Sequence, residues 1–487
     1  LKVRVFRLRL LKRGLDKISR CGFDMEKRPA ILYIGPSISW KSFLGAIRDA
    51  GFAAIACIAE DYHGGPMNAF LPFNELRTAD RHKELGFEAV IDHREPYRII
   101  EQARTLEDTL SLHIAGVLRA NEADTAVIDF VAAGLGLPHN PLSSLLARRD
   151  KAAMKEALQA AGLAHAAFAR IVDLQQVASA VQRLGLPVVV KTPSCASSSD
   201  VFVCRSTEAV VQRAEEVLGK KSPWGDQPSY VLLEEYLDGP EYAVNIFSDG
   251  RGQSFVTDLW SYKRKETPEG NVLYESIRSS DPAELPEACS YALGVCKAVG
   301  ICMEAGHVEL KMTKRGPVMV EVGARRPGGQ KTEMLAHIVP TWDPYAAQVL
   351  TCCGKPPPLP TGGFSPAKLV RHVFFHIVEA GIVTAVRGEA AIRALRSFYS
   401  MSVMAKVGEF AMATTDIVSC AGFVWLVGTS EKQLDDDEHM ARSSFVVETR
   451  ARAEEPEKKL QKLCTPLPQP CERSPAMTTW PFSLISR

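Results

Sequence analysis

The sequence predicts an α/β protein, with a small parallel sheet near the N-terminus followed by antiparallel strands. Two observations support this fold class. Residues 31–35 and 53–59 are apolar runs separated by a helical pattern that reaches Ala50, which is the β-α-β opening of a parallel sheet. Residues 307–323 alternate in polarity on both sides of a glycine-containing turn, as the two strands of a hairpin do.

Composition agrees with a globular enzyme-sized chain. At 487 residues and 46% hydrophobic content, the chain can bury the cores of two or three domains. A formal net charge of +1 gives no general attraction to nucleic acid or to an anionic membrane, so neither is expected as a partner. No apolar run reaches the roughly 18 residues of a transmembrane helix. Twelve cysteines without a Cys-x-x-Cys pair suggest reduced thiols and a cytoplasmic location.

We expect five segments along the chain. Residues 1–29 form a basic extension, in which residues 1–20 hold eight Lys/Arg and one acid, Asp16. If residues 1–24 are a transit peptide, the location is an organelle; a start misplaced upstream of Met25 explains the composition equally well. The later segments are an N-terminal α/β domain, a lid subdomain, a core with the C-terminal part, and a disordered tail, at residues 30–140, 141–239, 240–443 and 444–487.

Several local patterns predict individual elements. Residues 89–92 and 125–128 are apolar and β-branched, as further strands of the N-terminal domain would be. Gly35-Pro36-Ser37 is poor in glycine for a nucleotide-binding loop, so we assign it to a substrate-side turn. Asp150 is expected to cap a helix at residues 151–161. In the C-terminal part, short strands are expected at residues 368–378, 381–386 and 422–427.

The hairpin at residues 307–323 carries two opposed carboxylates. A three-residue loop, Lys314-Arg315-Gly316, places Glu309 opposite Glu321 on one face, with His307 nearby. Like charges that face each other across a sheet repel unless a cation lies between them, and magnesium or manganese bound by carboxylate oxygens is the cation we expect. A solvated face with two harmless glutamates is the alternative. The opposite face then carries the apolar residues Leu310, Val318, Val320 and Val322.

Two upstream segments suit a nucleotide. Residues 187–191 form an apolar strand that ends in Lys191, and a loop of small residues follows at 194–200. Such a lysine places an ammonium group on phosphate oxygens while backbone N–H groups close over them. Residues 230–244 run as an apolar strand into two glutamates, turn at Asp238-Gly239 and return as an alternating strand. The alternatives are a serine-rich hairpin with an exposed lysine, and surface carboxylates.

In this order and spacing, the segments resemble the ATP-grasp superfamily, and within it the carboxylate–amine ligases similar to bacterial L-amino-acid (dipeptide) ligases and carnosine synthase. The resemblance covers residues 30–443 and implies a parallel-sheet preATP-grasp domain, a lid subdomain and an antiparallel core sheet. It rests on Arg148-Arg149-Asp150-Lys151, on Lys191, on Glu234-Glu235-Tyr236-Leu237 with Glu241, and on the set Glu309, Glu321 and Arg325.

The resemblance assigns ATP-binding roles. Two lysines contact ATP phosphates in relatives, which implies this role for Lys151 and Lys191. The loop serines Ser197 and Ser198 are expected beside the phosphates. Adenine falls to Glu234 and Glu235 with the backbone near Leu237, and ribose falls to Glu241.

The metal and the chemistry are implied in the same way. Magnesium falls to Glu309 and Glu321, with His307 as a further site residue. Arg325 is expected to act with Lys191 in catalysis by stabilising the acyl phosphate and the transferring phosphoryl group. The implied reaction joins a small-molecule carboxylate and an amine, expected to be amino acids, into an amide while ATP becomes ADP and phosphate. The resemblance also allows a homodimer.

Two departures from the family pattern keep other functions open. The loop at 194–200 has no glycine, and Ser197 and Asp200 stand where glycines are expected, so the loop clamps phosphates less tightly. A weakly active or non-catalytic ATP-binding relative is therefore one alternative. Gly323 occupies the place of a third, asparagine metal ligand; amino-acid ligases tolerate glycine there, which disfavours the other alternative, a carboxylase or purine-pathway enzyme of the same superfamily.

Overall fold

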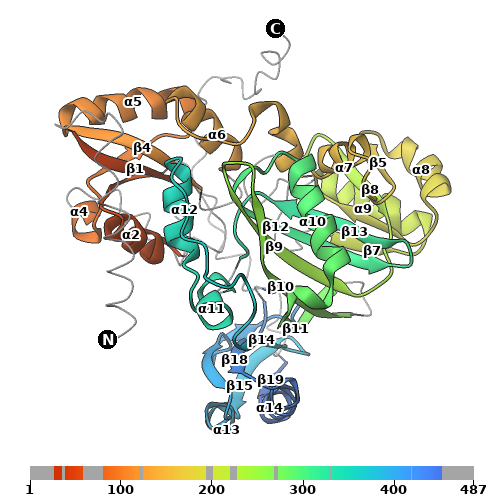
Figure 1. The fold of residues 1–487 in the computed structure, drawn as a ribbon. Coiled ribbons are helices and arrows are strands. Elements are labelled where there is room, and N and C mark those ends of the chain that lie inside the picture. Colours follow the sequence, from red (N-terminus) through yellow and green to blue (C-terminus); the bar gives the residue numbers. More distant parts are fainter. Residues whose placement is uncertain are drawn as a thin grey trace, which may run out of the picture.

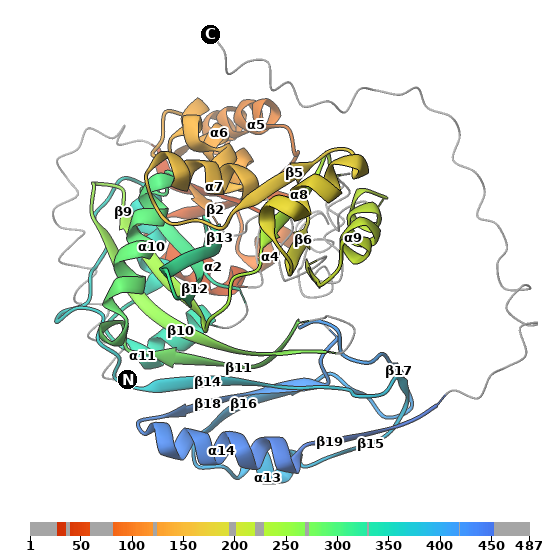
Figure 2. The ribbon, with the colours of Figure 1, turned by 90° about the vertical axis from the view of Figure 1, so that its right-hand side faces the viewer.

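The structure is a computed structural model, and it describes residues 27–35, 39–58, 81–119, 124–193, 201–219, 228–267, 272–328, 331–417 and 419–451. A parallel-sheet part, a small four-stranded sheet and a large antiparallel sheet surround the middle of the molecule, and a C-terminal layer lies against the far strands of the large sheet (Figures 1 and 2). No helix within the described ranges combines the length and the apolar character that crossing a membrane requires.

The N-terminal part is a parallel sheet in the order β3-β2-β1-β4. Its strands are buried on both faces between helices, as parallel strands usually are. Order reverses between β1 and β4, and ligands of open α/β sheets bind outside the carboxyl ends of strands at such a point. The elements are β1 (Arg28–Ile34), α2 (Trp40–Asp49), β2 (Ala53–Ile58), α4 (Arg81–Leu85), β3 (Ala89–Asp92), α5 (Pro96–Thr109), β4 (Leu112–Arg119) and α6 (Thr125–Gly134).

The prediction of a strand at residues 125–128 is wrong, because these residues begin helix α6. A short apolar run fits either element, and here it continues with buried residues at helical spacing, Ile128, Val131 and Ala132. The missing strand is β4, whose pattern is interrupted by His113 and Arg119. The predicted strands at 31–35, 53–59 and 89–92 are confirmed as β1, β2 and β3.

A small antiparallel sheet follows in the order β5-β8-β6-β7. The preceding helix, α7 (Lys151–Ala160), is capped as predicted, because Asp150 Oδ1 accepts from the Ala153 N–H at 2.8 Å. Met154 and Leu158 of α7 pack into the core of the large sheet, so the small sheet begins only after this helix. Its elements are β5 (Phe168–Ile171), α8 (Val177–Leu184), β6 (Val188–Lys191), β7 (Val201–Cys204), α9 (Thr207–Gly219) and β8 (Val231–Glu235).

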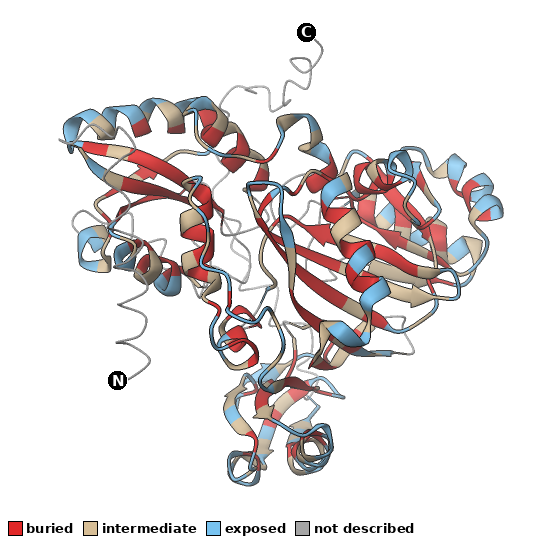
Figure 3. Ribbon diagram, in the orientation of Figure 1, coloured by how far each residue is buried: buried red, intermediate tan, exposed pale blue. Residues whose placement is uncertain are grey.

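The large sheet has the order β13-β12-β9-β10-β11-β14-β18-β16. Helix α10 (Pro286–Ala298) buries one face, and α11 (Lys331–Ile338) contributes Met334, Leu335 and Ile338 to the core on the other, which gives the continuous buried band of Figure 3. The strands are β9 (Glu241–Asp249), β10 (Ser254–Glu266), β11 (Val272–Ser280), β12 (Met303–Thr313), β13 (Gly316–Gly323), β14 (Leu369–Phe375), β16 (Phe398–Val403) and β18 (Gly422–Gly428).

The hairpin β12–β13 differs in detail from its prediction. Thr313 pairs with Gly316 across a two-residue turn, so the three-residue loop is wrong. A register shift next to Glu309 adds one residue on β13 and restores the predicted pairing of Glu309 with Glu321. The apolar face is also rearranged. Met319 joins the core under α10, whereas Val318 and Val320 pack with Leu237 in a separate cluster.

The C-terminal part extends the large sheet and adds a second layer. The strands predicted at 368–378, 381–386 and 422–427 are confirmed as β14, β15 and β18. The prediction that a disordered tail begins at residue 444 is wrong for its first residues. Ordered structure continues through Arg450, where β19 pairs with β15. The remaining elements are β15 (Gly381–Arg387), α13 (Glu389–Arg393), β17 (Phe410–Ala411), α14 (Glu431–Ser444) and β19 (Val446–Arg450).

Helix α12 (Pro344–Cys352) joins the parallel-sheet part to the large sheet. Its residues Tyr345, Val349 and Cys352 belong to the core on the α2 side of the parallel sheet, where the Tyr345 ring meets Phe43 edge to face at 5.1 Å. From the same helix, Gln348 donates to Glu304 of β12 at 2.8 Å. One short helix therefore serves two cores.

A glycine in the connection from β8 to β9 marks a close approach of two backbones. Gly239 has a φ of +134°, and a Cβ there would lie 2.0 Å from the carbonyl oxygen of Met312 in β12. Because a backbone oxygen cannot rotate away, we expect Gly239→Ala to lower the free energy of unfolding by about 2–5 kcal/mol. Urea unfolding measures this change.

The matched control is Gly252→Ala. Gly252 also has a positive φ, +98°, but an added Cβ there meets nothing within 4 Å. This variant carries only the conformational penalty of about 1 kcal/mol. Equal losses in the two variants would contradict the close approach of Gly239 to β12.

Candidate active site

One face of the large sheet carries a row of polar side chains. Strands β12 and β13 bring Glu309 opposite Glu321, and on the other side of β12 residue Asn245 of β9 pairs with His307. Side chains alternate along a strand, so His307 and Glu309, two residues apart, point to the same face. The structure thus brings together three of the residues predicted around the metal.

Glu309 is the less exposed member of the carboxylate pair, with 14% of its side chain exposed against 26% for Glu321. Its Oε1 accepts from the Tyr262 hydroxyl at 3.2 Å and lies 3.3 Å from His307 Nε2, while its Oε2 lies 3.9 Å from Arg264 Nη2. Burial acts to raise the pKa of Glu309, but the hydrogen bond and charge of His307 and the charge of Arg264 hold it well below its usual range. Glu309 is therefore ionised at neutral pH and available to a cation.

A hydrogen-bond chain behind Glu309 orients His307. His307 Nδ1 lies 2.6 Å from Asn245 Oδ1, and because Asn245 donates its amide to Asp258, the network assigns a proton to Nδ1. Burial lowers the pKa of His307, although the hydrogen bond and the charge of Glu309 raise it. Asn245 therefore directs the other ring nitrogen, Nε2, toward Glu309, which lies 3.3 Å away.

Glu321 is more exposed than Glu309 and faces a lysine. Its Oε2 lies 3.2 Å from Lys151 Nζ, with 26% of the glutamate side chain exposed and 6% of the lysine. Within the described ranges, no three His, Cys, Asp or Glu side chains gather into a metal site. Two carboxylates on neighbouring strands fit magnesium, because this ion is usually held by one or two carboxylates and completes its shell with phosphate oxygens and water.

Lys191 lies at the end of β6, in a buried row of charges. Its Nζ is 2.7 Å from Glu234 Oε2, and Lys155 Nζ is 2.6 Å from Glu234 Oε1. All three side chains are at most 5% exposed. Burial acts to raise the pKa of Glu234, but the charges of Lys155 and Lys191 lower it below the ordinary value. Glu234 is thus an ionised bridge between two lysines, and its role toward adenine remains a prediction.

The other residues predicted for adenine and ribose are also engaged within the protein. Glu235 Oε1 accepts from the Ala167 N–H at 2.9 Å, and the Leu237 carbonyl accepts from Lys311 Nζ at 3.0 Å. Glu241 lies 2.6 Å from Arg264 Nη2, and burial raises its pKa to about 7 against the opposing charge of that arginine. Their roles toward a nucleotide remain predictions.

Two cationic side chains from the segment after β13 lie near the carboxylate pair Glu309 and Glu321. Lys331, 9% exposed, donates to the Tyr262 hydroxyl at 3.2 Å. Burial lowers the pKa of Lys331 to about 8 although Glu309 raises it, and the charge of Arg325 lowers it further. Arg325 donates from Nη1 to the Arg326 carbonyl at 2.9 Å. Arg325 and Lys331 therefore concentrate positive charge beside Glu309.

Sequence reasoning missed four residues of this site, Lys155, Tyr262, Arg264 and Lys331. Lys155 left a signal, since it lies four residues after Lys151 and hence on the same face of helix α7. Tyr262 and Arg264 left none, because their place depends on the pairing of β9 with β10. The predicted phosphate-loop residues Ser197 and Ser198 lie outside the described residues, as does Asp200.

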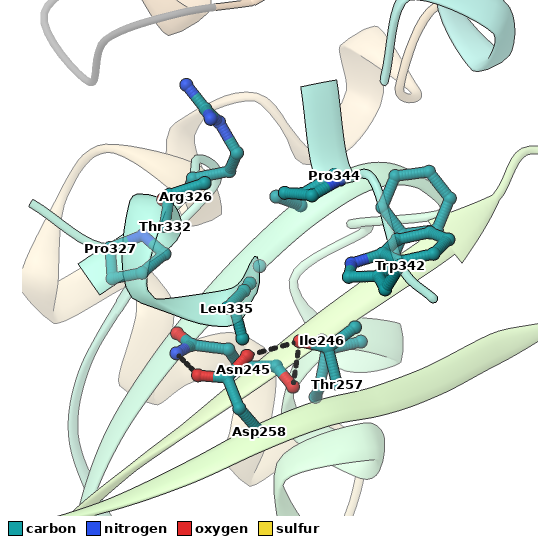
Figure 4. A pocket seen from close by; sticks show the side chains of 13 residues that line it. Asn245, Ile246, Thr257, Asp258, Arg326, Pro327, Thr332, Leu335, Trp342 and Pro344 are labelled. Atoms are coloured by element: carbon teal, nitrogen blue, oxygen red, sulfur yellow. Dashed lines mark hydrogen bonds between the residues drawn. The ribbon is translucent and has the colours of Figure 1, made fainter. Parts of the chain in front are cut away.

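A small cavity lies behind the site, between the large sheet and helices α11 and α12 (Figure 4). Its volume is about 20 Å³, and Asn245, Asp258, Arg326 and Trp342 are among its walls. A water molecule fits such a space, and an amino acid does not.

One known protein family matches part of the chain. The family described as "Phosphoribosylglycinamide synthetase, ATP-grasp (A) domain" matches residues 149–271. This range includes Lys151, Lys191, Glu234 and Glu241, but it ends before the carboxylate pair on β12 and β13.

A curated protein is similar to a longer part of the chain. The chain is 30% identical over 275 residues to dapdiamide A synthase from Enterobacter agglomerans, which covers 53% of this chain and 59% of that protein. It spans about half the length of the curated relatives it matches.

Two solved structures share the fold over most of the chain. The L-amino acid ligase from Bacillus licheniformis aligns with a TM-score of 0.66 at 16% identity, over 87% of this chain and 99% of that one. A biotin carboxylase from Campylobacter jejuni aligns with a TM-score of 0.58 at 13% identity, over 88% of this chain and 93% of that one.

Proposed function

We propose that the chain is a member of the ATP-grasp superfamily and an ATP-dependent carboxylate–amine ligase that forms an amide through an acyl phosphate. One observation carries this proposal. Lys151 lies 3.2 Å from Glu321, so helix α7, which carries one of the two lysines assigned to ATP, meets the hairpin that carries the two carboxylates. The similarity to a dapdiamide synthase and an L-amino acid ligase supports amino acids as the substrates.

The residues of the site have separate roles in the proposed reaction. Lys151 and Lys191 hold the phosphates of ATP, and Glu309 and Glu321 would hold a magnesium ion that neutralises phosphate charge. Arg325 and Lys331 orient the donor carboxylate, which attacks the γ-phosphorus and releases ADP. The amine of the second substrate then attacks the acyl carbon, loses a proton and expels phosphate. Positioning and charge neutralisation suffice for both steps, and no protein nucleophile is needed.

The test is the identity of the nucleotide product. With magnesium, ATP and a mixture of amino acids, we expect ADP and phosphate, and hydroxylamine should trap the activated carboxylate as a hydroxamate. Mass spectrometry of the products identifies the joined amino acids. Formation of AMP and pyrophosphate would contradict the acyl-phosphate route.

A second function, carboxylation, is favoured only by the likeness to biotin carboxylase. The same assay separates the two. A ligase releases phosphate in response to amino acids in bicarbonate-free buffer, whereas a carboxylase responds to bicarbonate. ATP binding without any phosphate release would identify a non-catalytic relative.

A further inference from the structure

The side chains of Lys155, Glu234 and Lys191 form a buried row of charges. Lys191 is assigned to the phosphates of ATP, whereas Lys155 is an additional lysine without an assigned role. Lys191 ends β6, Glu234 is in β8, and Lys155 comes from α7 behind them. Lys155 is fully buried, and its Nζ lies 2.6 Å from Glu234 Oε1. It therefore reaches the nucleotide only through Glu234.

The charges of this row explain why the extra lysine matters. Glu234 is ionised and lies 2.7 Å from Lys191, so alone it would cancel the charge that Lys191 offers to phosphate. With Lys155 on the other oxygen, the three side chains carry a net charge of +1. An unpaired buried carboxylate beside polyphosphate would also repel it.

We propose that Lys155 is a positioning residue for ATP, which neutralises Glu234 and so leaves the positive charge of Lys191 available to the phosphates. This inference rests on the proposed function, because it requires that the site binds ATP. It replaces the adenine role predicted for the Glu234 side chain with an electrostatic one.

The protonation of Lys155 supplies an independent readout. Burial lowers its pKa to about 8, even though Glu234 raises it, and Lys191 and Lys151 lower it further. Lys151 itself pairs with Glu321 of β13 at 3.2 Å. Lys155 is charged below this pH and neutral above it, so the net charge of the row falls from +1 to 0 as the pH rises past about 8. ATP should bind more weakly there.

Equilibrium binding of the non-hydrolysable analogue AMP-PNP with magnesium to the full chain tests the proposal. We expect Lys155→Met to weaken binding about 10-fold or more at pH 7. Adding Glu234→Gln to that variant restores the net charge of +1 and should bring the affinity back to within about threefold of wild type. Lys155→Arg should bind like wild type at pH 7 and keep its affinity up to pH 9, because guanidinium stays protonated.

The control is Lys263→Met. Lys263 forms a comparable pair with Glu275 at 3.4 Å, but in strands β10 and β11 and with 55% of its side chain exposed. This variant should leave AMP-PNP binding unchanged. Circular dichroism confirms that each variant is folded; if Lys155→Met is not, the double variant and the pH profiles of wild type and Lys155→Arg decide.

The outcomes separate this inference from the proposed function. No binding of AMP-PNP by the wild type would overturn both. Tight binding by wild type and equally by Lys155→Met would overturn only the role of Lys155. A weakened single variant that the added Glu234→Gln does not rescue, or a wild-type pH profile identical to that of Lys155→Arg, would show that Lys155 does not act through charge.

Discussion

Glu321→Gln is expected to abolish magnesium-dependent turnover while the protein stays folded. The amide keeps the shape of the side chain but removes one of the two charges that face each other across β12 and β13. Losing a carboxylate ligand of a metal that neutralises transferring phosphate should lower kcat by at least about 100-fold. Phosphate release at saturating ATP, measured over a magnesium titration, checks this.

Stability should change little in the same variant. Removal of Glu321 relieves its repulsion with Glu309 but also loses its pair with Lys151 at 3.2 Å. The two effects oppose each other, and the net change should stay within about 1 kcal/mol. Glu275→Gln is the matched control, because Glu275 is equally exposed, at 26%, and pairs with Lys263 in the same sheet. Full turnover by Glu321→Gln at ordinary magnesium concentrations would refute the metal assignment.

Arg325→Met should strongly reduce catalysis but leave ATP binding nearly unchanged. Burial lowers the pKa values of Lys331 and His307, and the charge of Arg325 lowers them further. The guanidinium charge of Arg325 therefore lies beside the carboxylate pair Glu309 and Glu321. A positioned charge of this kind stabilises the transition state more than bound ATP, so we expect kcat to fall by about 100- to 1000-fold and AMP-PNP affinity to change less than threefold.

The next residue in the chain provides the contrast. The Arg326 guanidinium carbon lies 4.2 Å from the ring centres of both Phe43 and Tyr345, so this side chain is stacked between α2 and α12. Arg326→Met should lose about 1–3 kcal/mol of stability with a much smaller loss of turnover. If Arg325→Met lowered the melting temperature as much as Arg326→Met does, its effect would be structural.

The sequence predicted the pairing of Glu309 with Glu321 for a physical reason. Opposed like charges across a hairpin are rare unless a ligand stabilises them, and two local signals, the turn and the alternation, determine the register. Even so, two errors in the predicted hairpin cancel each other. The real turn is one residue shorter than predicted, and strand β13 has one extra residue, Val320, which restores the pairing of Glu309 with Glu321. Val318 and Val320 therefore do not share a core cluster with Leu310 and Val322 as predicted, although Glu321 was placed correctly.

Long-range pairing explains what the sequence did not show. Arg264 reaches Glu241 because β10 lies beside β9, and nothing within either strand specifies that contact. The sequence did not show that Lys155 from α7 and Lys191 from β6 lie against the two oxygens of Glu234, because these three residues come from separate elements. Residues 125–128 were misassigned because a short apolar run has no period that separates a strand from a helix.

The sharing of α12 between two cores has a consequence for how the chain folds during synthesis. The parallel sheet is made first, but the Tyr345, Val349 and Cys352 side chains that complete its core on the α2 side come from residues 344–352. Ribosomes add about 5 to 20 residues per second, so the roughly 300 residues between Phe43 and Tyr345 take on the order of 15–60 s. For that time the apolar face of α2, with Phe43 and Ile47, lacks its native cover, and a nascent chain stalled before residue 344 should bind chaperones that the completed protein does not.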